Sequence, residues 1–490
     1  MPSFSKGALH TDKYQINMMY AHWINGSHKK WRAFDLYFRR LPFGNGFAVF
    51  AGLERALQYL KELRFTEEDI AYLKEQEENY DPDFLEMLRS FRFTGDVYAA
   101  REGSLVFPGE PILRLEGPVM DLQLVETALL NFIGFQTLVA TKAARIRQVA
   151  PNDILLEFGT RRAQESDAAV WGARATYIAG FDATSNLYAG KRFGIPTRGT
   201  HSHSWVQDFP SELEAFRAFA HAFPDQSVLL VDTYDTLRSG VPNAIQVGLE
   251  LKAKGKRLVG IRLDSGDLAY LSKKARQMLD EAGLTDTSIV ASSDLDETTI
   301  LNLKAQKAKI DSWGIGTKLI TAYDQPALGA VYKVVARREN GIWEPTIKIS
   351  SNPEKVTTPD RKAVYRIVDR KTGKARGDLI THLDEQIDES KPLTLFHPVQ
   401  TYRKKRVRNF QAVPLLHPVI KNGKQVYSLP TLDEIRTYHQ KQISMFWEEY
   451  LRLLNPEEYP VNLSKELWET KQQMIQQVYQ TVRRENGYKE

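Results

Sequence analysis

The chain has 490 residues, no Cys, and 66 Lys and Arg residues against 61 Asp and Glu residues, which leaves a formal net charge of +5. This length predicts several domains and a large core, because 42% of the residues are hydrophobic. Without Cys the chain has no disulfide framework, thiolate nucleophile or cysteine-ligated metal centre. A surplus of five charges is too small to indicate a nucleic-acid-binding protein, so we expect no nucleic-acid partner.

The N-terminal residues 1–7 lack the apolar segment of a signal peptide, and the chain has no apolar run of the roughly 18 residues that span a membrane. We therefore expect a soluble, cytoplasmic protein with no membrane partner. The basic run at residues 403–408 is compatible with RNA binding, but only Tyr402 and Phe410 supply aromatic rings beside it. A solvated loop or strand is the favoured interpretation of this run.

Helical and strand patterns are mixed in the first part of the chain. Residues 53–63 and 66–79 have amphipathic patterns, and Thr66 with Asp69 predicts a capping box at the start of the second helix. Short strands separated by Gly and Pro turns are expected at residues 93–101, 104–107 and 112–116. We therefore predict an α+β domain with an antiparallel sheet over residues 1–130.

The middle of the chain alternates short apolar runs with segments of helix length, which is typical of parallel βα units. Strands are expected at residues 154–158, 196–201, 228–231, 258–263, 289–291 and 313–315. Helices are expected between them at residues 163–188, 211–222, 241–253, 267–282 and 295–307. The steady spacing favours a (β/α) barrel over a doubly wound sheet and predicts a barrel-like catalytic domain over residues 131–335. In both architectures the active site lies at the carboxyl ends of the strands.

The last part of the chain is predicted to hold a strand-rich segment at residues 336–430 and C-terminal helices at residues 431–490. Thr431 with Glu434 predicts a capping box that opens a helix to about residue 454. A final helix is expected after Asn455 and Pro456.

Two His residues lie close together in the segment Gly199-Thr200-His201-Ser202-His203-Ser204-Trp205, where a strand is expected to end. On a strand the two rings would point to the same face. One interpretation is a packed, hydrogen-bonded His. A zinc site is disfavoured, because no further His occurs between His221 and His382 to complete the ligands. Proton transfer or phosphoryl acceptance by a His is the remaining interpretation.

Charged residues follow the other expected strands. They are Glu157, Arg161, Arg162, Asp232, Asp235, Arg262, Asp264, Asp267, Asp294 and Lys318. Each alone is explained as a helix cap, but together they predict an anion site in which Arg binds carboxylate or phosphate and paired Asp residues hold Mg²⁺. The run Gly314-Ile315-Gly316-Thr317 resembles a phosphate-binding loop. The chain has no Walker A motif and no dinucleotide fingerprint.

Several of these motifs closely resemble the nicotinate phosphoribosyltransferase family. In chain order they are Leu9-His10-Thr11-Asp12-Lys13-Tyr14-Gln15, Phe158-Gly159-Thr160-Arg161-Arg162-Ala163-Gln164, the Gly199 to Trp205 segment, Gly260-Ile261-Arg262-Leu263-Asp264-Ser265-Gly266-Asp267 and Gly314-Ile315-Gly316-Thr317. His10 stands where the family pattern has an apolar residue. The resemblance implies condensation of nicotinate with phosphoribosyl pyrophosphate to nicotinate mononucleotide and pyrophosphate, coupled to ATP hydrolysis, as the first step of NAD salvage.

The resemblance also implies a fold and an assembly. The fold is α/β, an irregular (β/α) barrel with an N-terminal α+β domain that later chain segments join, here with a C-terminal helical tail. The cofactors are Mg²⁺ and ATP as a co-substrate, and the partners are nicotinate and phosphoribosyl pyrophosphate. The protein is expected to be a homodimer with shared active sites.

By matching motif positions, His203 resembles the family's phosphorylated His, and Tyr14 resembles the residue that stacks on the pyridine ring. The alternative for Tyr14 is a core residue at the start of a helix. His201 has no role implied by the resemblance.

The remaining site residues are inferred in the same way. Arg262 and Thr200 resemble nicotinate-binding residues, and Arg161 resembles a carboxylate or phosphate partner. Asp264 resembles a residue that acts on the ribose or the metal. Thr317, with Gly314 and Gly316, resembles the site for the ribose phosphate. No metal ligands are identified.

Three alternative functions stay open from the sequence. A nicotinamide phosphoribosyltransferase would have the same barrel with its site at the strand ends. Its substrate is a neutral amide, however, and needs a hydrogen-bond acceptor as well as a donor in the site. A metal-dependent amidohydrolase needs His ligands that the chain lacks at the strand ends. A non-catalytic protein that binds nucleotide or RNA would show salt-sensitive binding without turnover.

Overall fold

The computed structural model describes residues 7–400 and 402–485 and divides into two compact units. Unit 1 is Met1–Leu138 with Ala327–Glu490, and unit 2 is Val139–Pro326. The division into four segments made from the sequence stays a prediction, and residues 1–6, expected to carry no signal peptide, lie outside the described residues. Within the described ranges, no helix has both the length and the apolar character needed to cross a membrane.

Unit 2 is built on a parallel sheet with the strand order β7-β6-β11-β10-β9-β8. The strands are β6 (Ile154–Glu157), β7 (Ala183–Thr184), β8 (Val228–Leu230), β9 (Gly260–Leu263), β10 (Ser288–Ala291) and β11 (Ser312–Ile315). Because all pairings are parallel, the carboxyl ends of these strands lie along one edge, which is where α/β folds place their sites.

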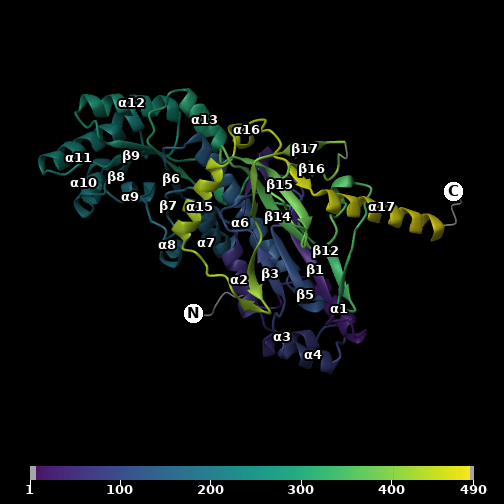
Figure 1. The fold of residues 1–490 in the computed structure, drawn as a ribbon. Helices are drawn as coiled ribbons and strands as arrows, with labels where there is room; N and C mark the ends of the chain where they lie inside the picture. Colours follow the sequence, from purple (N-terminus) through teal and green to yellow (C-terminus); the bar gives the residue numbers. More distant parts are fainter. Residues whose placement is uncertain (1–6, 401, 486–490) are drawn as a thin grey trace. The chain divides into compact units, whose positions relative to one another are not determined.

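Helices join these strands along the chain, and Figure 1 shows them in teal around the sheet of unit 2. They are α7 (Glu165–Ile178), α8 (Leu187–Phe193), α9 (His203–Gln207), α10 (Glu212–Ala222), α11 (Val241–Ala253), α12 (Leu268–Glu281), α13 (Glu297–Ala305) and α14 (Thr317–Ile320), with short helical turns η2 (Thr160–Arg162) and η3 (Thr236–Gly240). α6 (Glu126–Val149) precedes β6 and spans the boundary between the units.

The prediction of one helix over residues 163–188 is wrong. α7 ends at Ile178, and Gly180 follows with a φ of +110°, a left-handed conformation that ends a helix. A side chain at Gly180 would also lie 3.2 Å from Arg147. The chain then forms β7 and α8, neither of which was expected.

The predicted strand at residues 196–201 is also wrong. Only Thr197 makes an isolated parallel bridge, to Thr184, because Pro196 has no N–H to donate to a ladder. The mixed α/β class and the parallel sheet are confirmed. Closure of the barrel is not confirmed, since β7 and β8 end the strand order of the described residues without pairing to each other.

Unit 1 contains two larger sheets and one short pair of strands. The first sheet joins β1 (Trp31–Phe38), β3 (Asp96–Ala99), β5 (Leu113–Pro118), β12 (Ala330–Glu339), β13 (Ile342–Pro345), β19 (His417–Lys421) and β20 (Lys424–Gln425). The second joins β14 (Lys362–Asp369), β15 (Ala375–His382), β16 (Leu393–Phe396), β17 (Lys404–Val407), β18 (Phe410–Pro414) and β21 (Val461–Leu463). The short pair is β2 (Ala48–Val49) with β4 (Leu105–Val106). Late strands therefore pair with early ones, as between β1 and β12.

The helices of unit 1 agree in part with the sequence. They are α1 (Lys13–Ile24), α2 (Leu53–Glu62), α3 (Glu67–Lys74), α4 (Pro82–Arg89), α5 (Val119–Leu124), α15 (Leu432–Ser444), α16 (Glu448–Leu451) and α17 (Lys465–Glu485), with short turns η1 (Pro42–Gly44) and η4 (Pro353–Lys355). Both predicted capping boxes, at Thr66 and at Thr431, are confirmed.

The prediction of a purely helical C-terminal tail needs correction. β21 lies between α16 and α17 and pairs with β15 in parallel and with β16 in antiparallel orientation. Its central residue Asn462 is buried, so this stretch is part of a sheet core. The last helix begins at Lys465, after β21, and not directly after Pro456.

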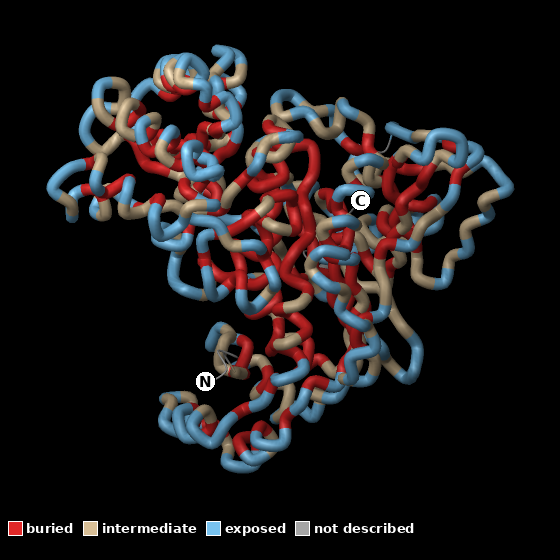
Figure 2. Tube along the Cα trace, turned by 90° about the vertical axis from the view of Figure 1, so that its left-hand side faces the viewer, coloured by how far each residue is buried: buried red, intermediate tan, exposed pale blue. Residues whose placement is uncertain are grey.

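Buried residues run through the interior of both units and include most of helix α7 as well as the central strands, whereas exposed residues lie along the outside (Figure 2). In unit 2, Leu229, Ile261, Ile289 and Ile315 of four neighbouring strands have no exposed surface. This rigid core holds the polar residues that follow the strands in fixed positions.

Candidate active site

Arg262 organises the carboxyl edge of the parallel sheet. It is the third residue of β9, and its guanidinium donates three hydrogen bonds to groups from separate segments. Nε donates to Ser292 Oγ at 2.8 Å, Nη1 to Thr200 Oγ1 at 3.0 Å and Nη2 to Asp264 Oδ1 at 2.8 Å. The Arg side chain is only 17% exposed, so this fork is held in one orientation.

Asp264 completes the pair with Arg262. Burial alone would raise the pKa of Asp264, but the hydrogen bond from Ser292 and the charge of Arg262 outweigh burial and lower it. The Asp264 N–H donates to Asp232 Oδ2 at 3.1 Å, which links the ends of β8 and β9. The carboxylate is therefore ionised at neutral pH and fixed on two sides.

The two His residues of the Gly199 to Trp205 segment have different environments, and the expectation that they share one strand face is wrong. His201 is buried, and its Nε2 accepts a hydrogen bond from Leu230 N at 3.1 Å. Its other nitrogen, Nδ1, therefore carries the proton and faces Ser202 O at 3.3 Å. Burial lowers the pKa of His201 to about 4. His201 is a neutral residue that fixes the loop onto β8.

His203 lies at the first turn of α9, and its side chain is 41% exposed. Nδ1 is 3.1 Å from Thr233 Oγ1, and Nε2 is 3.9 Å from Asp264 Oδ2. An exposed imidazole next to a carboxylate suits proton or phosphoryl transfer. The structure thus brings His203, Thr200, Arg262 and Asp264 together at the ends of β8 and β9.

The end of β11 provides a second cluster. Gly314 is buried within β11, where a Cβ would lie 2.6 Å from the Phe158 ring, so its small size is needed for packing. Gly316 precedes the short helix α14, which begins at Thr317. Lys318 Nζ donates to Asp296 Oδ2 at 2.8 Å, and this bond raises the pKa of Lys318. Phosphate binding by Gly314, Gly316 and Thr317 stays a prediction.

Arg161 follows β6 on the short turn η2 and is exposed. Its side chain makes no ion pair with any residue in the described ranges, so its guanidinium is available to an anion. Glu157 fixes the start of this turn. Its carboxylate is buried and accepts hydrogen bonds from the Gly159 N–H and the Thr184 hydroxyl. Burial raises the pKa of Glu157. Glu157 is therefore a positioning residue and is not exposed to a ligand.

Tyr14 belongs to unit 1, where it is the second residue of α1 and 50% exposed. Burial, together with the charges of Glu126 and Asp12, raises its pKa. Because Tyr14 is exposed, the alternative of a core Tyr is wrong. Its ring is free to stack on a flat ligand.

Sequence reasoning missed three residues of the site, Ser292, Asp296 and Thr233. Ser292 donates to Asp264 and accepts from Arg262, Asp296 holds Lys318, and Thr233 contacts His203. Each follows or precedes a strand-end residue already selected, but a Ser, Thr or Asp in a βα turn is usually a helix cap. Only the pairing of the strands reveals these contacts.

Comparison with known proteins agrees with this geometry. Residues 9–134 match the nicotinate phosphoribosyltransferase (NAPRTase) N-terminal domain, residues 154–370 match the NAPRTase family, and residues 361–471 match the nicotinate phosphoribosyltransferase C-terminal domain. The nicotinate phosphoribosyltransferase of Bacillus subtilis is 57% identical, and the alignment covers 98% of this chain and 97% of that one. The nicotinate phosphoribosyltransferase of Dictyostelium discoideum is 41% identical over 94% of this chain and 87% of its own.

Among solved structures, the human nicotinic acid phosphoribosyltransferase has a TM-score of 0.85 at 32% identity, and covers 94% of this chain and 99% of that chain. The nicotinate-nucleotide pyrophosphorylase of Pyrococcus furiosus has a TM-score of 0.68 at 23% identity, over 89% and 95% of the two chains, and shares the fold. The family models together match most of the chain, and the alignments with these relatives cover nearly all of it. The chain belongs to the nicotinate phosphoribosyltransferase family.

Proposed function

We propose that the protein condenses nicotinate with phosphoribosyl pyrophosphate to form nicotinate mononucleotide and pyrophosphate, with ATP as a co-substrate, in NAD salvage. The observation that carries this proposal is the Arg262 network, which holds a partly buried guanidinium, Thr200 and Asp264 together at the edge of the sheet. A preorganised Arg guanidinium and a hydroxyl can both donate hydrogen bonds to the carboxylate of nicotinate. The neutral amide of nicotinamide also needs a hydrogen-bond acceptor, so this pair of groups suits it less well.

The reaction breaks the bond between ribose C1 and pyrophosphate and forms a bond from C1 to the pyridine nitrogen. Positive charge develops on the ribose as the leaving group departs, so the site must neutralise the leaving anion and hold the pyridine in line. Arg262 and Thr200 orient the nicotinate, and Tyr14 stacks on its ring. Asp264, which is ionised, lies where it can stabilise the ribose cation. Arg161, Lys318, Gly314, Gly316 and Thr317 surround the phosphates.

His203 is the residue that couples the reaction to ATP. A ring nitrogen of His203 takes the γ-phosphoryl group of ATP and releases ADP, and water later removes it as phosphate. The phosphoryl group adds about −1.5 to −2 charge beside Asp264. That charge competes with Asp264 for Arg262 and so changes how tightly the site holds its substrates.

Mg²⁺ fits this site as an ion that arrives with the substrate. No group of three potential metal-ligating side chains occurs in the described part of the chain, whereas Mg²⁺ needs only one or two carboxylates besides substrate phosphates. Asp264 Oδ2 and the exposed Asp294 are carboxylate oxygens at neighbouring strand ends and would hold it. When bound, Mg²⁺ neutralises pyrophosphate oxygens.

The barrel and the dimer complete the proposal. The Leu230 N–H donates a hydrogen bond to His201, which links β8 to the segment that follows Thr197. Thr197 in turn bridges to Thr184 of β7, and an irregular barrel would have to join β7 to β8 through this segment. A homodimer with shared sites would combine Tyr14 of one subunit with Arg262 of the other. Mixing inactive Tyr14→Ala and Arg262→Ala proteins should then restore about a quarter of wild-type activity, since half of the dimers are mixed and each has one intact site. No recovery would exclude shared sites.

The experiment that tests the reaction is a product assay with nicotinate and phosphoribosyl pyrophosphate. Nicotinate mononucleotide and pyrophosphate should appear in equal amounts. Pyrophosphate release without a nucleotide product would contradict the proposal, because water and not the pyridine nitrogen would then attack C1.

A further inference from the structure

Unit 1 contains a cavity of about 500 Å³ that is separate from the residues assigned above. Its lining comes from β1, β14, β17, β21, α17 and the loop between β16 and β17, all within unit 1. Below it is called the unit 1 cavity. Its volume lies in the range of roughly 300–1,000 Å³ that is typical of small-molecule sites.

One side of the unit 1 cavity carries the buried ammonium of Lys471. This residue of α17 is only 4% exposed. Its Nζ has one hydrogen bond, to Thr358 Oγ1 at 3.4 Å, and no carboxylate within ion-pair distance in the described ranges. Burial, and then the charge of Lys362, lowers the pKa of Lys471 to about 8. An unpaired buried cation costs several kcal/mol, so its retention calls for a counter-ion.

A second buried lysine in the same lining, Lys362, differs from Lys471 because the protein supplies its ammonium with an ion pair and hydrogen-bond acceptors. Lys362 Nζ is paired with Asp35 Oδ2 at 2.8 Å and donates to the backbone carbonyls of Thr358, Pro359 and Asp360. Lys362 therefore has its own partners and needs no ligand. Lys471 lies on the same cavity without them.

Two further donors in the lining have no acceptor. Asn462 is 5% exposed, and its Nδ2 has no hydrogen-bond partner in the described part of the chain. His397 Nδ1 accepts from the N–H groups of Val399 and Gln400 at 3.2 Å and 2.8 Å, so the proton of the neutral ring is on Nε2. Burial lowers the pKa of His397, which keeps the ring neutral at pH 7. The lining thus carries donors at Asn462 and His397 for which the described residues supply no acceptor. One unpartnered acceptor, Asp35 Oδ1, also lies on the lining, on the carboxylate that pairs with Lys362.

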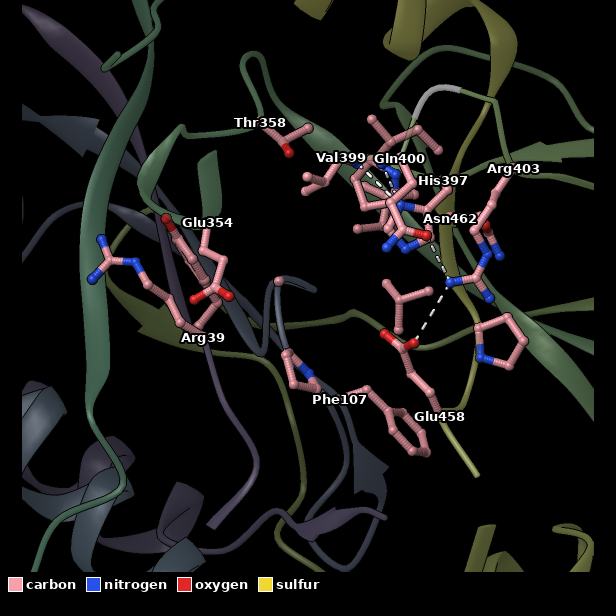
Figure 3. Close-up of a pocket in the computed structure, with 18 of the residues that line it drawn as sticks. Arg39, Phe107, Glu354, Thr358, His397, Val399, Gln400, Arg403, Glu458 and Asn462 are labelled. Carbon is pink, nitrogen blue, oxygen red and sulfur yellow. Dashed lines mark hydrogen bonds and ion pairs between the residues drawn. The ribbon is translucent and has the colours of Figure 1, made fainter. Parts of the chain in front are cut away.

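The acidic residues of the lining are already paired with cations. Asp35 pairs with Lys362, Glu354 pairs with Arg40 at 3.1 Å, and Glu458 lies 3.7 Å from Arg403. Figure 3 shows His397, Gln400 and Asn462 on one side of the unit 1 cavity near Arg403, with Arg39 and Glu354 on the other side. Apolar side chains, among them Leu41, Val356 and Val399, also belong to the lining.

We propose that the unit 1 cavity binds a small organic anion whose phosphate or carboxylate head is held by Lys471, Asn462 and His397. The head supplies the acceptor oxygens that these three donors lack. The apolar lining holds the rest of the molecule. This site is additional to the proposed reaction, and it uses no residue of the carboxyl edge in unit 2.

The test is calorimetric titration of the full-length protein with inorganic phosphate, AMP and benzoate as three separate probes. Binding of at least one probe to wild type should include a component that Lys471→Met weakens at least about tenfold. AMP and benzoate distinguish a phosphate head from a carboxylate head, and inorganic phosphate shows what the head contributes alone. Lys465→Met, which removes an exposed lysine of the same helix, is the matched control and should bind like wild type.

Folding and active-site effects are separable in this design. Lys471→Met removes an unpaired buried charge, so the free protein should melt at a higher temperature than wild type while it loses the ligand. Arg262→Ala changes only unit 2 and should keep the binding component. Equal binding of all three probes by wild type and Lys471→Met would overturn the proposal, whatever reaction the protein catalyses.

The pH dependence gives a second readout. The titratable groups that face Lys471 are Lys362 and His397, and Asp35 acts through Lys362. Because the anion needs the charged ammonium, its affinity should fall about tenfold per pH unit above the pKa of about 8. The same slope in Lys471→Met would assign the titration to Lys362 and contradict the role of Lys471.

Discussion

The carboxyl edge of unit 2 and the unit 1 cavity both offer cations to an anion, but they hold these cations differently. At the edge, Arg262 is paired with Asp264 and Lys318 with Asp296, each at 2.8 Å. In the cavity, the one hydrogen bond of Lys471 Nζ within the described ranges is to the Thr358 hydroxyl at 3.4 Å. The paired edge is oriented before any substrate arrives, as catalysis requires. The unpaired lysine gains its stabilisation only from a ligand, as a binding site allows.

The largest expected effect comes from breaking the paired edge. Arg262→Ala removes three hydrogen bonds and leaves Asp264 without its counter-ion, so kcat/KM for nicotinate should fall by at least about 10³-fold. Steady-state kinetics measure this loss. Arg217→Ala removes an exposed Arg of unit 2 that pairs with Glu250, and this control should retain activity. Similar losses in both variants would show that the Arg262 effect is general destabilisation.

The next largest effect concerns His201, the buried imidazole near the carboxyl edge of unit 2. The pKa of His201 falls from 6.5 to about 4 on folding, so the folded state binds fewer protons than the unfolded state between these values. The stability from His201 is fully present above pH 6.5 and is lost as the pH falls toward 4, by about 3 kcal/mol. Urea unfolding followed across this range measures it.

His201→Gln is the matched variant for this prediction, because its amide oxygen can still accept from Leu230 N. It should flatten the pH dependence, whereas His201→Leu should lose about 1–3 kcal/mol at pH 7 as well. A pH profile unchanged in both variants would show that His201 does not titrate on unfolding as described.

A smaller effect separates the exposed His from the buried one. His203→Ala should abolish the stimulation by ATP, a coupling of about 5- to 150-fold, and retain slow ATP-independent transfer. Rates with and without ATP, together with detection of acid-labile phosphate on the protein, test this. His221→Ala, an exposed His on α10, should keep the stimulation. Full ATP stimulation in His203→Ala would refute the phosphohistidine role.

The smallest expected effect comes from giving Lys471 of the unit 1 cavity a carboxylate partner, such as Arg262 and Lys318 have at the carboxyl edge of unit 2. Thr358→Asp gives Lys471 a carboxylate partner, so the pKa of Lys471 should rise above about 8 and the anion should no longer bind. Nitrogen NMR of the lysine side chains measures the pKa, and the titration above measures binding. Thr358→Val keeps the shape without the charge and should still bind the anion. Retained binding in Thr358→Asp would argue that the head group lies elsewhere.

The sequence was informative where a residue's type determines its local chemistry. The runs before Arg262, Asp264 and Lys318 have the apolar pattern of buried parallel strands, so their positions at strand ends could be predicted. The break at Gly180 and the loss of a strand after Pro196 were not predicted, because both depend on which backbone groups find partners in the sheet. Propensity alone does not report such partners.

The same limit explains what was missed among functional residues. Lys471 lies in an amphipathic helix where lysine is usually solvated. Its burial becomes visible only in the fold, where α17 packs against β15 and β16. His201 and His203 are two residues apart, yet one is buried and one is partly exposed, because His201 lies in a loop and His203 begins helix α9, where a strand was expected. The different environments of these two His residues could not be predicted from their spacing in the sequence.

The most direct test of the proposed function is a comparison of nicotinate with nicotinamide, each with phosphoribosyl pyrophosphate and each with and without ATP. We expect nicotinate mononucleotide to form from the acid, faster with ATP, and little product from the amide. Preferential conversion of nicotinamide would contradict the role assigned to Arg262 and Thr200 and with it the proposed function.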